Sequence, residues 1–297
     1  MSDTTASLRR KIAGAGELQS VVRTMKAVAA SSIGQYERSV RALDDYYRTV
    51  ELGLGACFRE ACPASATGGR KKETDAGTIG AVVFGSDQGL VGQFNDVVAD
   101  YAIKTLATLP GKPRVWAVGE RVHARLEDAG LRLMGLFTVP NSVKAITPLV
   151  GQIQIESETH RAKGDFACVY VFHNRPQLGA LYEPVGQRLL PLDAQWQAGL
   201  AKVRWPTGNL PEVMGGGTGV LRALIREYLF ISLFRACAES LASENASRLA
   251  AMQRADKNIG DLQQDLTRTF HRLRQNGIDE ELFDVISGFE ALSAHEK

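Results

Sequence analysis

Two widely separated stretches of this sequence share an apolar spacing of alternating three and four residues. Such spacing averages 3.5 residues and is typical of the contact stripe of a left-handed coiled coil. Each stripe is narrow, so neither helix could bury its apolar face alone, and we expect the two helices to pair. The first stripe comprises Val22, Ala29, Ile33, Tyr36, Val40, Leu43, Tyr47, Val50 and Leu54, and the second Met252, Ala255, Ile259, Leu262, Leu266, Thr269 and Leu273.

The simplest closure is an antiparallel pair, with the start of the first helix beside the end of the second. We expect the first helix over residues 7–59 and the last over residues 219–276. Gly277 would cap or kink the last helix, and a shorter helix would follow over residues 279–286. Fifty helical residues would span roughly 75 Å, so something outside a single core must pack against them.

The chain between these stripes alternates short β-branched runs with helical segments. This rhythm implies a largely parallel sheet covered on both faces. Pro184 places the last strand at a sheet edge, and Pro148 would interrupt or start the third helix. We predict strands over 78–84, 114–118, 131–137, 165–173 and 180–190, and helices over 96–109, 120–128 and 142–162.

The predicted fold class is therefore α/β, with a long antiparallel coiled coil of N- and C-terminal helices and a central Rossmann-like α/β domain. The segments between them are rich in small and polar residues and are expected to be linkers. The predicted division is an N-terminal helix over 1–60, a linker over 61–77, the α/β domain over 78–205, a linker over 206–219 and a C-terminal helix over 220–297.

Composition excludes several classes of protein. Hydrophobic residues make up 44% and charged residues 23% of the chain, and the formal net charge is +2. These values are ordinary for a soluble protein and give no bulk reason to expect nucleic acid or an anionic membrane. No stretch approaches the roughly 18 apolar residues of a spanning helix, and the first residues lack the apolar core of a signal peptide. The four cysteines form no CxxC pair, which favours reduced structural thiols.

A glycine-bearing loop over residues 85–92 follows the first predicted strand, where α/β sheets often bind phosphate. Its glycines do not match GxGxxG, and no GK[ST] supplies a phosphate-binding lysine, so we favour a structural loop over a nucleotide site. His173 ends a predicted strand, and we interpret it as a loop histidine whose ring is hydrogen-bonded within the fold rather than as a functional residue. Asp256, Asp261 and Asp265 read as a solvated helix face rather than a metal site. We predict no catalytic residue, cofactor or metal.

Three separated blocks resemble the gamma subunit of F-type ATP synthases. Residues 19–31 (QSVVRTMKAVAAS) are similar to the family's TQKITKAMxMVAASK segment. Residues 86–92 (SDQGLVG) resemble SDRGLCGGLN, with Asp87, Gly89 and Gly92 at the family's motif positions. Residues 239–252 (ESLASENASRLAAM) resemble ENLASEHAARMMAM. Gln88 and Val91 replace the family's loop arginine and cysteine, which suggests a divergent member.

The resemblance implies a rotor that is not itself catalytic. Its coiled coil would insert into a ring of alternating alpha and beta subunits, and its α/β domain would sit with the epsilon subunit on the membrane ring of c subunits. Met25, Lys26, Arg274 and Gln275 would face the catch region of a beta subunit. The complex would lie at the cytoplasmic face of the inner (plasma) membrane, with this chain peripheral to it.

Two alternatives from other classes remain at this point. One is a nucleotide-binding α/β enzyme that uses the loop over residues 85–92. The other is a coiled-coil adaptor that assembles partners without an ATPase ring. A further choice concerns the basic residues of the first helix, among them Arg9, Arg23 and Lys26, which could be a solvated face or a contact for an acidic partner.

Overall fold

The computed structural model describes residues 4–61, 77–162, 166–177, 180–209, 211–212 and 217–295. The chain divides into two compact units. The larger unit comprises residues 29–248, and the smaller unit pairs the segment up to Val28 with the segment from Leu249 onward. Most of the predicted linker over residues 61–77, and part of that over residues 206–219, lies outside the described residues.

The larger unit is built on a five-stranded sheet in the order β3-β2-β1-β4-β5. Strands β1 to β4 pair in parallel, and β5 joins β4 in antiparallel fashion at one edge. This confirms the predicted α/β class and the edge position of the strand that contains Pro184. The strands are β1 (Thr78–Phe84), β2 (Lys112–Val118), β3 (Arg132–Phe137), β4 (Cys168–Gln177) and β5 (Ala180–Leu190).

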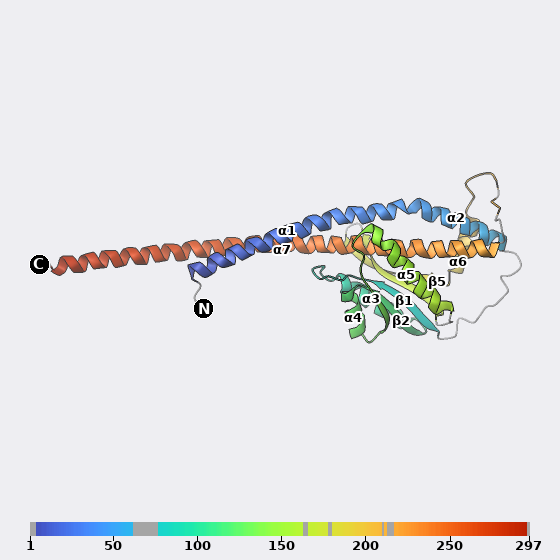
Figure 1. The fold of residues 1–297 in the computed structure, drawn as a ribbon, viewed down its shortest axis with the longest axis horizontal. Helices are drawn as coiled ribbons and strands as arrows, with labels where there is room; N and C mark the ends of the chain where they lie inside the picture. The colour runs from blue at the N-terminus through green and yellow to red at the C-terminus, as the bar shows by residue number, and fades with distance from the viewer. Residues whose placement is uncertain are drawn as a thin grey trace. The chain divides into compact units, whose positions relative to one another are not determined.

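Both faces of the sheet are covered, because successive side chains of a strand point to opposite sides. In β1, Ile79, Ala81 and Val83 pack with buried residues of α3 (Phe94–Thr108) and α4 (Glu120–Asp128). The alternate residues Val82 and Phe84 pack on the other face with α5 (Val143–Ala162), α2 (Asp44–Ala61) and residues 228–242 of α7 (Gly217–His295). Figure 1 shows this layering, with α5 and α7 on one side of the strands and α3 and α4 on the other.

The smaller unit contains the antiparallel helix pair that the apolar spacing predicts. Its partners are the first part of α1 (Thr5–Ala42) and the part of α7 that follows residue 248. Lys26 bonds Asp256 at 3.0 Å, and the guanidinium of Arg9 lies 5.7 Å from the ring centre of Phe270. Residue numbers therefore rise along α1 as those of their α7 partners fall, which defines the antiparallel direction.

The prediction of one helix over residues 7–59 is wrong, because α1 ends at Ala42 and α2 begins at Asp44. At the break, the Leu43 amide donates to the Val40 carbonyl three residues back, 3.1 Å away. Asp44 and Asp45 occupy the first turn of α2, where carboxylates interact favourably with the helix dipole. Leu43 still packs against the core, so the apolar stripe continues through the break and conceals it.

Two further expected interruptions are absent from the helices. Pro148 lies inside α5, where its neighbours Leu149 and Val150 are buried and hold the segment against the sheet. Gly277 neither caps nor kinks a helix that ends there, since α7 continues to His295 and includes the predicted short helix. One glycine costs a helix only about 1 kcal/mol relative to alanine, which the surrounding turns can offset.

A short helix, α6 (Ala194–Lys202), was not predicted. Its start carries a readable signal: the Asp193 carboxylate accepts from the amides of Gln195 and Trp196, as an N-cap residue does. Cys57, Cys168 and Cys237 are free thiols, in agreement with the predicted structural role, and Cys62 lies outside the described residues.

Candidate functional site

The inward face of the helix pair repeats every four and then three residues. On α1, Leu8, Ile12, Ala15, Gln19, Val22 and Lys26 are buried or partly buried; on α7, so are Met252, Asp256, Ile259, Gln263, Leu266, Phe270 and Leu273. The expected position of Leu262 in this stripe is wrong, because its side chain is 52% exposed. Counting from Ile259, a step of four reaches Gln263, so a polar residue takes the inward position beside the leucine.

Asp256 is the charged centre of this inward face. Its carboxylate accepts from Lys26 Nζ at 3.0 Å, from Gln19 Nε2 at 3.2 Å and from Arg23 Nε at 3.4 Å. The hydrogen bond from Lys26 is the main reason that the pKa of this carboxyl lies below its usual value. The prediction of a solvated face is therefore wrong for Asp256. A polar group at an inward position can fix the register of a helix pair, which the apolar spacing alone leaves open.

The four residues expected to contact a beta subunit fall into two groups. Met25 and Lys26 are partly buried, and Lys26 is already paired with Asp256 inside the chain. Arg274 and Gln275 are exposed on α7. They lie about five helical turns beyond Asp256, or roughly 27 Å along the helix. The fold thus places each group at its own level of the helix pair and does not bring the two groups together.

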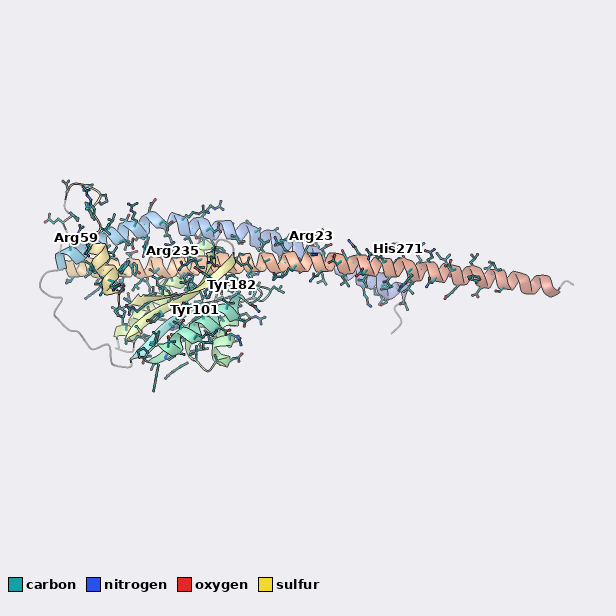
Figure 2. The ribbon with its side chains drawn as sticks, turned by 180° about the vertical axis from the view of Figure 1, so that it is seen from behind. Arg23, Arg59, Tyr101, Tyr182, Arg235 and His271 are labelled. Carbon is teal, nitrogen blue, oxygen red and sulfur yellow. The ribbon has the colours of Figure 1, made fainter. Side chains whose placement is uncertain are left out.

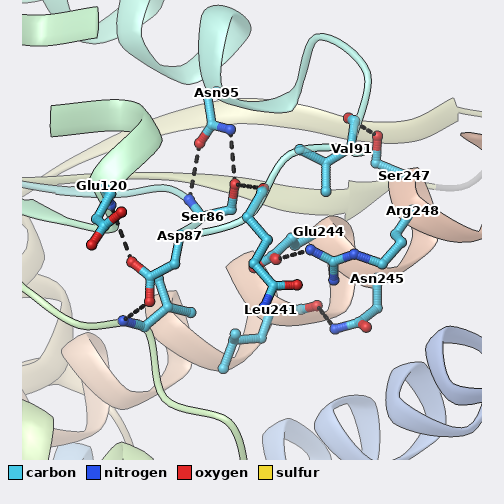
Figure 3. Close-up of polar contacts among 12 residues, drawn as sticks. Ser86, Asp87, Val91, Asn95, Glu120, Leu241, Glu244, Asn245, Ser247 and Arg248 are labelled. Atoms are coloured by element: carbon cyan, nitrogen blue, oxygen red, sulfur yellow. Dashed lines mark hydrogen bonds and ion pairs between the residues drawn. The ribbon is translucent and has the colours of Figure 1, made fainter. Parts of the chain in front are cut away.

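The second family block is the loop between β1 and α3. Ser86 is fully buried at its start, and its amide donates to the Asn95 side-chain oxygen at 2.9 Å (Figure 3). The Asn95 amide group in turn donates to Ser86 Oγ at 2.8 Å, and that hydroxyl donates to the Gln88 carbonyl at 2.9 Å. The two bonds with Asn95 tie the loop to the first turn of α3, which it precedes, and the bond to Gln88 closes a turn within the loop.

Asp87 links the loop to the neighbouring α4 and to the segment after β3. Its two carboxylate oxygens accept from the amides of Glu120, at 3.1 Å, and Val139, at 2.9 Å. Glu120 opens α4, so the carboxylate satisfies one of the amides that a helix start leaves free. The role of Asp87 in this structure is to join three segments of the larger unit.

The rest of the loop turns onto α7. Leu90 and Gly92 have φ angles of 63° and 59°, a left-handed conformation that glycine adopts without a steric penalty. Between them, the buried Val91 accepts a hydrogen bond at its carbonyl from Ser247 Oγ. Gly89 is partly buried beside them. The predicted motif residues therefore hold the loop against other elements of the same unit.

A buried ion pair lies beneath this loop on α7. Arg248 Nη2 donates to Glu244 Oε1 at 2.6 Å, and the two side chains are only 13% and 7% exposed (Figure 3). Burial raises the pKa of the Glu244 carboxyl, Arg248 lowers it in part, and the nearby charge of Asp87 adds to the rise. This pair was not identified from the sequence. Its signal was a glutamate and an arginine one turn apart among small residues.

These contacts leave little of the loop free for ligand chemistry. A phosphate at the start of α4 would have to displace the Asp87 carboxylate from the Glu120 amide. Among the described residues, no group of three or more His, Cys, Asp or Glu side chains is arranged to hold a metal ion. The loop geometry therefore favours a structural role for the loop over a nucleotide site.

The described residues also include no helix that is long and apolar enough to span a membrane.

His173 does not end a strand, as the sequence suggested, but lies within β4. Its ring Nε2 is 2.8 Å from Glu239 Oε2, and the histidine is buried. Asp265, in contrast, is exposed as predicted and pairs only locally with Arg268 at 3.3 Å.

Comparisons with known proteins agree with this architecture along almost the whole chain. A family model described as ATP synthase matches residues 4–292. The ATP synthase gamma chain of Dechloromonas aromatica is 24% identical over 288 residues, covering 96% of this chain and 98% of the relative. That of Rhizobium johnstonii is 26% identical over 297 residues, with 96% and 98% covered.

A solved structure has the same fold. It is a chain of the Euglena gracilis mitochondrial ATP synthase, in a cryo-EM structure of OSCP/F1/c-ring in rotational state 3. The TM-score is 0.67 at 16% sequence identity, and the match covers 99% of this chain and 96% of that one. Taken with the end-to-end family match, these findings identify this chain as a member of the ATP synthase gamma-chain family.

Proposed function

We propose that this gamma chain is the non-catalytic rotor shaft of an ATP synthase, coupling rotation of a membrane ring to catalysis in a surrounding head. The observation that carries the proposal is the antiparallel pairing of α1 and α7 in a chain that matches gamma chains from end to end. The charged cluster at Asp256 supports it, because a shaft that transmits torque must keep its two helices in one register.

The head in this proposal is a ring of alternating alpha and beta subunits around the helix pair. The last described turns of α7 carry five exposed apolar side chains, namely Ile278, Leu282, Phe283, Val285 and Ile286. Clustered apolar groups of this kind favour a protein partner that covers them. Different faces of the rotating shaft would stabilise different conformations of the beta subunits, so that contact free energy shifts each site in turn.

Met25, Lys26, Arg274 and Gln275 are the proposed contacts with a beta subunit. Arg274 and Gln275 are exposed and available for this role. Arg274 would donate charge-assisted hydrogen bonds to beta-subunit carboxylates. Lys26 already bonds Asp256, so we assign it to holding the helix pair at the level where Met25 meets the partner.

The α/β domain over residues 78–205 would meet the epsilon subunit and the c-ring, and the assembly would sit at the cytoplasmic face of the inner membrane. The hydrogen bonds of Asp87 to Glu120 and Val139, which join the loop to other elements of the sheet unit, support a structural role for this domain. In this proposal the ATP chemistry belongs to the beta subunits, and this chain holds neither cofactor nor metal.

Reconstitution tests the proposal. The chain is mixed with alpha and beta subunits of the same source, and the isolated complex is assayed for composition and ATP hydrolysis. We expect one copy of this chain per three alpha–beta pairs and hydrolysis that depends on its presence. Failure to associate, together with direct nucleotide binding by the chain alone, would overturn the proposal.

The contact residues are tested in the same complex. Arg274→Ala should lower the ATPase rate or its coupling, whereas Arg272→Ala, an exposed arginine two residues earlier on α7, should leave both unchanged. If the two variants behave alike, the proposed contact of Arg274 is refuted. The rotor proposal is not affected by that result, because it is tested separately by the composition of the complex.

A further inference from the structure

A polar cavity of about 300 Å³ opens in the larger unit where α7 and α2 face β4 and β5. Its lining includes His173, Arg175, Gln187, Ser232, Arg235 and Glu239. Figure 2 shows Arg235, which comes from α7. The side chains of Arg175 and Arg235 are 47% and 44% exposed, whereas that of His173 is only 4% exposed. The two arginines therefore lie at the opening of the cavity and the histidine lies at its buried end.

The negative charge within the cavity is already compensated. Glu239 lies 2.8 Å from His173 Nε2 and accepts a hydrogen bond from Arg235 Nε at 2.9 Å. Arg175 Nε is a further 3.6 Å contact of the same carboxylate. These neighbours hold the pKa of Glu239 below its usual value even though burial raises it. With Glu239 ionised, the two guanidinium groups leave the lining with an excess of positive charge.

Two polar atoms of the cavity lack a partner. His173 Nδ1 and Ser232 Oγ are buried and make no hydrogen bond to the described residues. A buried donor or acceptor without a partner costs free energy, so a polar occupant that reaches these atoms would stabilise the fold. Both residues line the cavity, as do the two arginines.

We propose that this cavity binds a tetrahedral oxyanion, such as phosphate or sulfate, between Arg175, Arg235 and the ring of His173. Guanidinium groups present several N–H donors in a planar fork that matches the oxygens of such anions. The Ser232 hydroxyl supplies a further donor. The proposal rests on this cavity alone and is independent of the rotor function.

An oxyanion in the cavity would meet the ring at Nδ1, because Nε2 already faces the Glu239 carboxylate at 2.8 Å. This contact requires a hydrogen on both ring nitrogens, so that Nε2 donates to Glu239 and Nδ1 donates to the anion. The other charged or titratable groups around the ring are Arg235 from α7, Arg175 from β4 and Tyr47 from α2. Asp44 of α2 adds a carboxylate 3.7 Å from Arg235, on the far side of that side chain's bond to Glu239.

The experiment is a titration of the full chain with ¹⁵N-labelled histidine, followed by NMR of the ring nitrogens. Sodium sulfate and sodium phosphate are added at constant ionic strength, with sodium chloride as the reference salt and ADP as a nucleotide arm. His173 signals are assigned by their loss in His173→Gln. We expect saturable shifts of the His173 nitrogens with sulfate and phosphate.

A matched pair of variants locates the site. Arg175→Gln should weaken sulfate binding about tenfold, whereas Arg188→Gln, a half-exposed arginine of β5 that pairs with Asp193, should not. Unmoved His173 signals, which would mean that water alone fills the cavity, would overturn the proposal. So would shifts that chloride reproduces, binding of ADP without binding of sulfate or phosphate, or equal effects of the two variants.

Discussion

Replacing Arg248 by methionine isolates the buried charge of Glu244 beneath the loop over residues 85–92 and tests the reasoning about that loop. The change removes the guanidinium that donates to Glu244 at 2.6 Å and keeps most of the side-chain length. With the two side chains 13% and 7% exposed, water cannot take over from the missing partner. Breaking a buried pair in this way costs roughly 3–5 kcal/mol of unfolding free energy.

The cost should depend on pH in a definite direction. Burial and the charge of Asp87 raise the pKa of Glu244 in the folded chain, and Arg248, which opposes that rise, is gone in the variant. A carboxyl with a raised folded pKa costs nothing below its unfolded pKa. Its penalty then grows by up to about 1.4 kcal/mol per pH unit until the folded pKa is reached. Arg248→Met should therefore lie closest to wild type near pH 5 and furthest from it at pH 8.

Urea unfolding followed by tryptophan fluorescence measures this effect. All three tryptophans, Trp116, Trp196 and Trp205, belong to the larger unit, so the signal reports the unit that contains the ion pair. Adding Glu244→Gln to the variant should recover most of the loss at pH 8, because the buried charge is then absent. Arg222→Met, which changes an exposed arginine of the same helix and the same unit, is the matched control. A loss under 1 kcal/mol at pH 8, or no recovery in the double variant, would refute the reasoning.

Three further perturbations test the loop and the helix pair. Asp87→Ala leaves two backbone amides without their acceptor and should lower the unfolding free energy of the larger unit by about 1–3 kcal/mol in the same urea assay. Gly92→Ala forces a side chain into a φ of 59° and should cost about 1–2 kcal/mol by the same measurement. Asp256→Asn should accelerate amide hydrogen exchange of α1 around Lys26 without changing the fluorescence midpoint. Because the pKa of Asp256 is lowered in the fold, this difference should be present above its unfolded pKa, fade as pH falls through the folded pKa, and shrink in 1 M salt.

The antiparallel helix pair was predictable because its signal is periodic. Spacing of three and four residues at both ends of a chain indicates that two helices share an apolar face. The antiparallel direction, expected as the simplest closure, was also correct. The same spacing did not determine which residues face inward at every turn. Leu262 is apolar and lies outside the contact, whereas Gln263 and Asp256 are polar and lie within it. Asp256 is stabilised at its inward position by side chains of α1, more than 200 residues away in the sequence, so the local sequence pattern around it could not predict that position.

The sheet was predictable for a related reason, since buried strands are short apolar runs with clear boundaries. An apolar run does not show whether the strand continues through a polar residue, or which partner that residue has. His173 was read as the end of a strand because a histidine followed an apolar run. The strand instead continues to Gln177, and the ring is satisfied on one side by Glu239. That partner lies 66 residues away on α7, so its identity depends on how the helix packs over β4.

The packing of α7 also explains why one helix carries two kinds of sequence. Within residues 231–248 nearly every side chain is buried, and the run is rich in alanine, serine and cysteine, as in Ala236, Cys237 and Ser243. Small side chains let the helix lie close to its neighbours on all sides. A buried hydroxyl is stabilised there when it finds an acceptor, as Ser243 does in the Asn174 carbonyl at 3.0 Å. Beyond residue 252 only one face is covered, and most of the exposed side chains up to residue 276 are polar or charged. Because fewer buried contacts oppose local opening there, amide exchange should be slowest in the first stretch and faster in the second. The paired part of the helix thus leaves exposed side chains that are accessible to partners, whereas the first stretch is enclosed by its own unit.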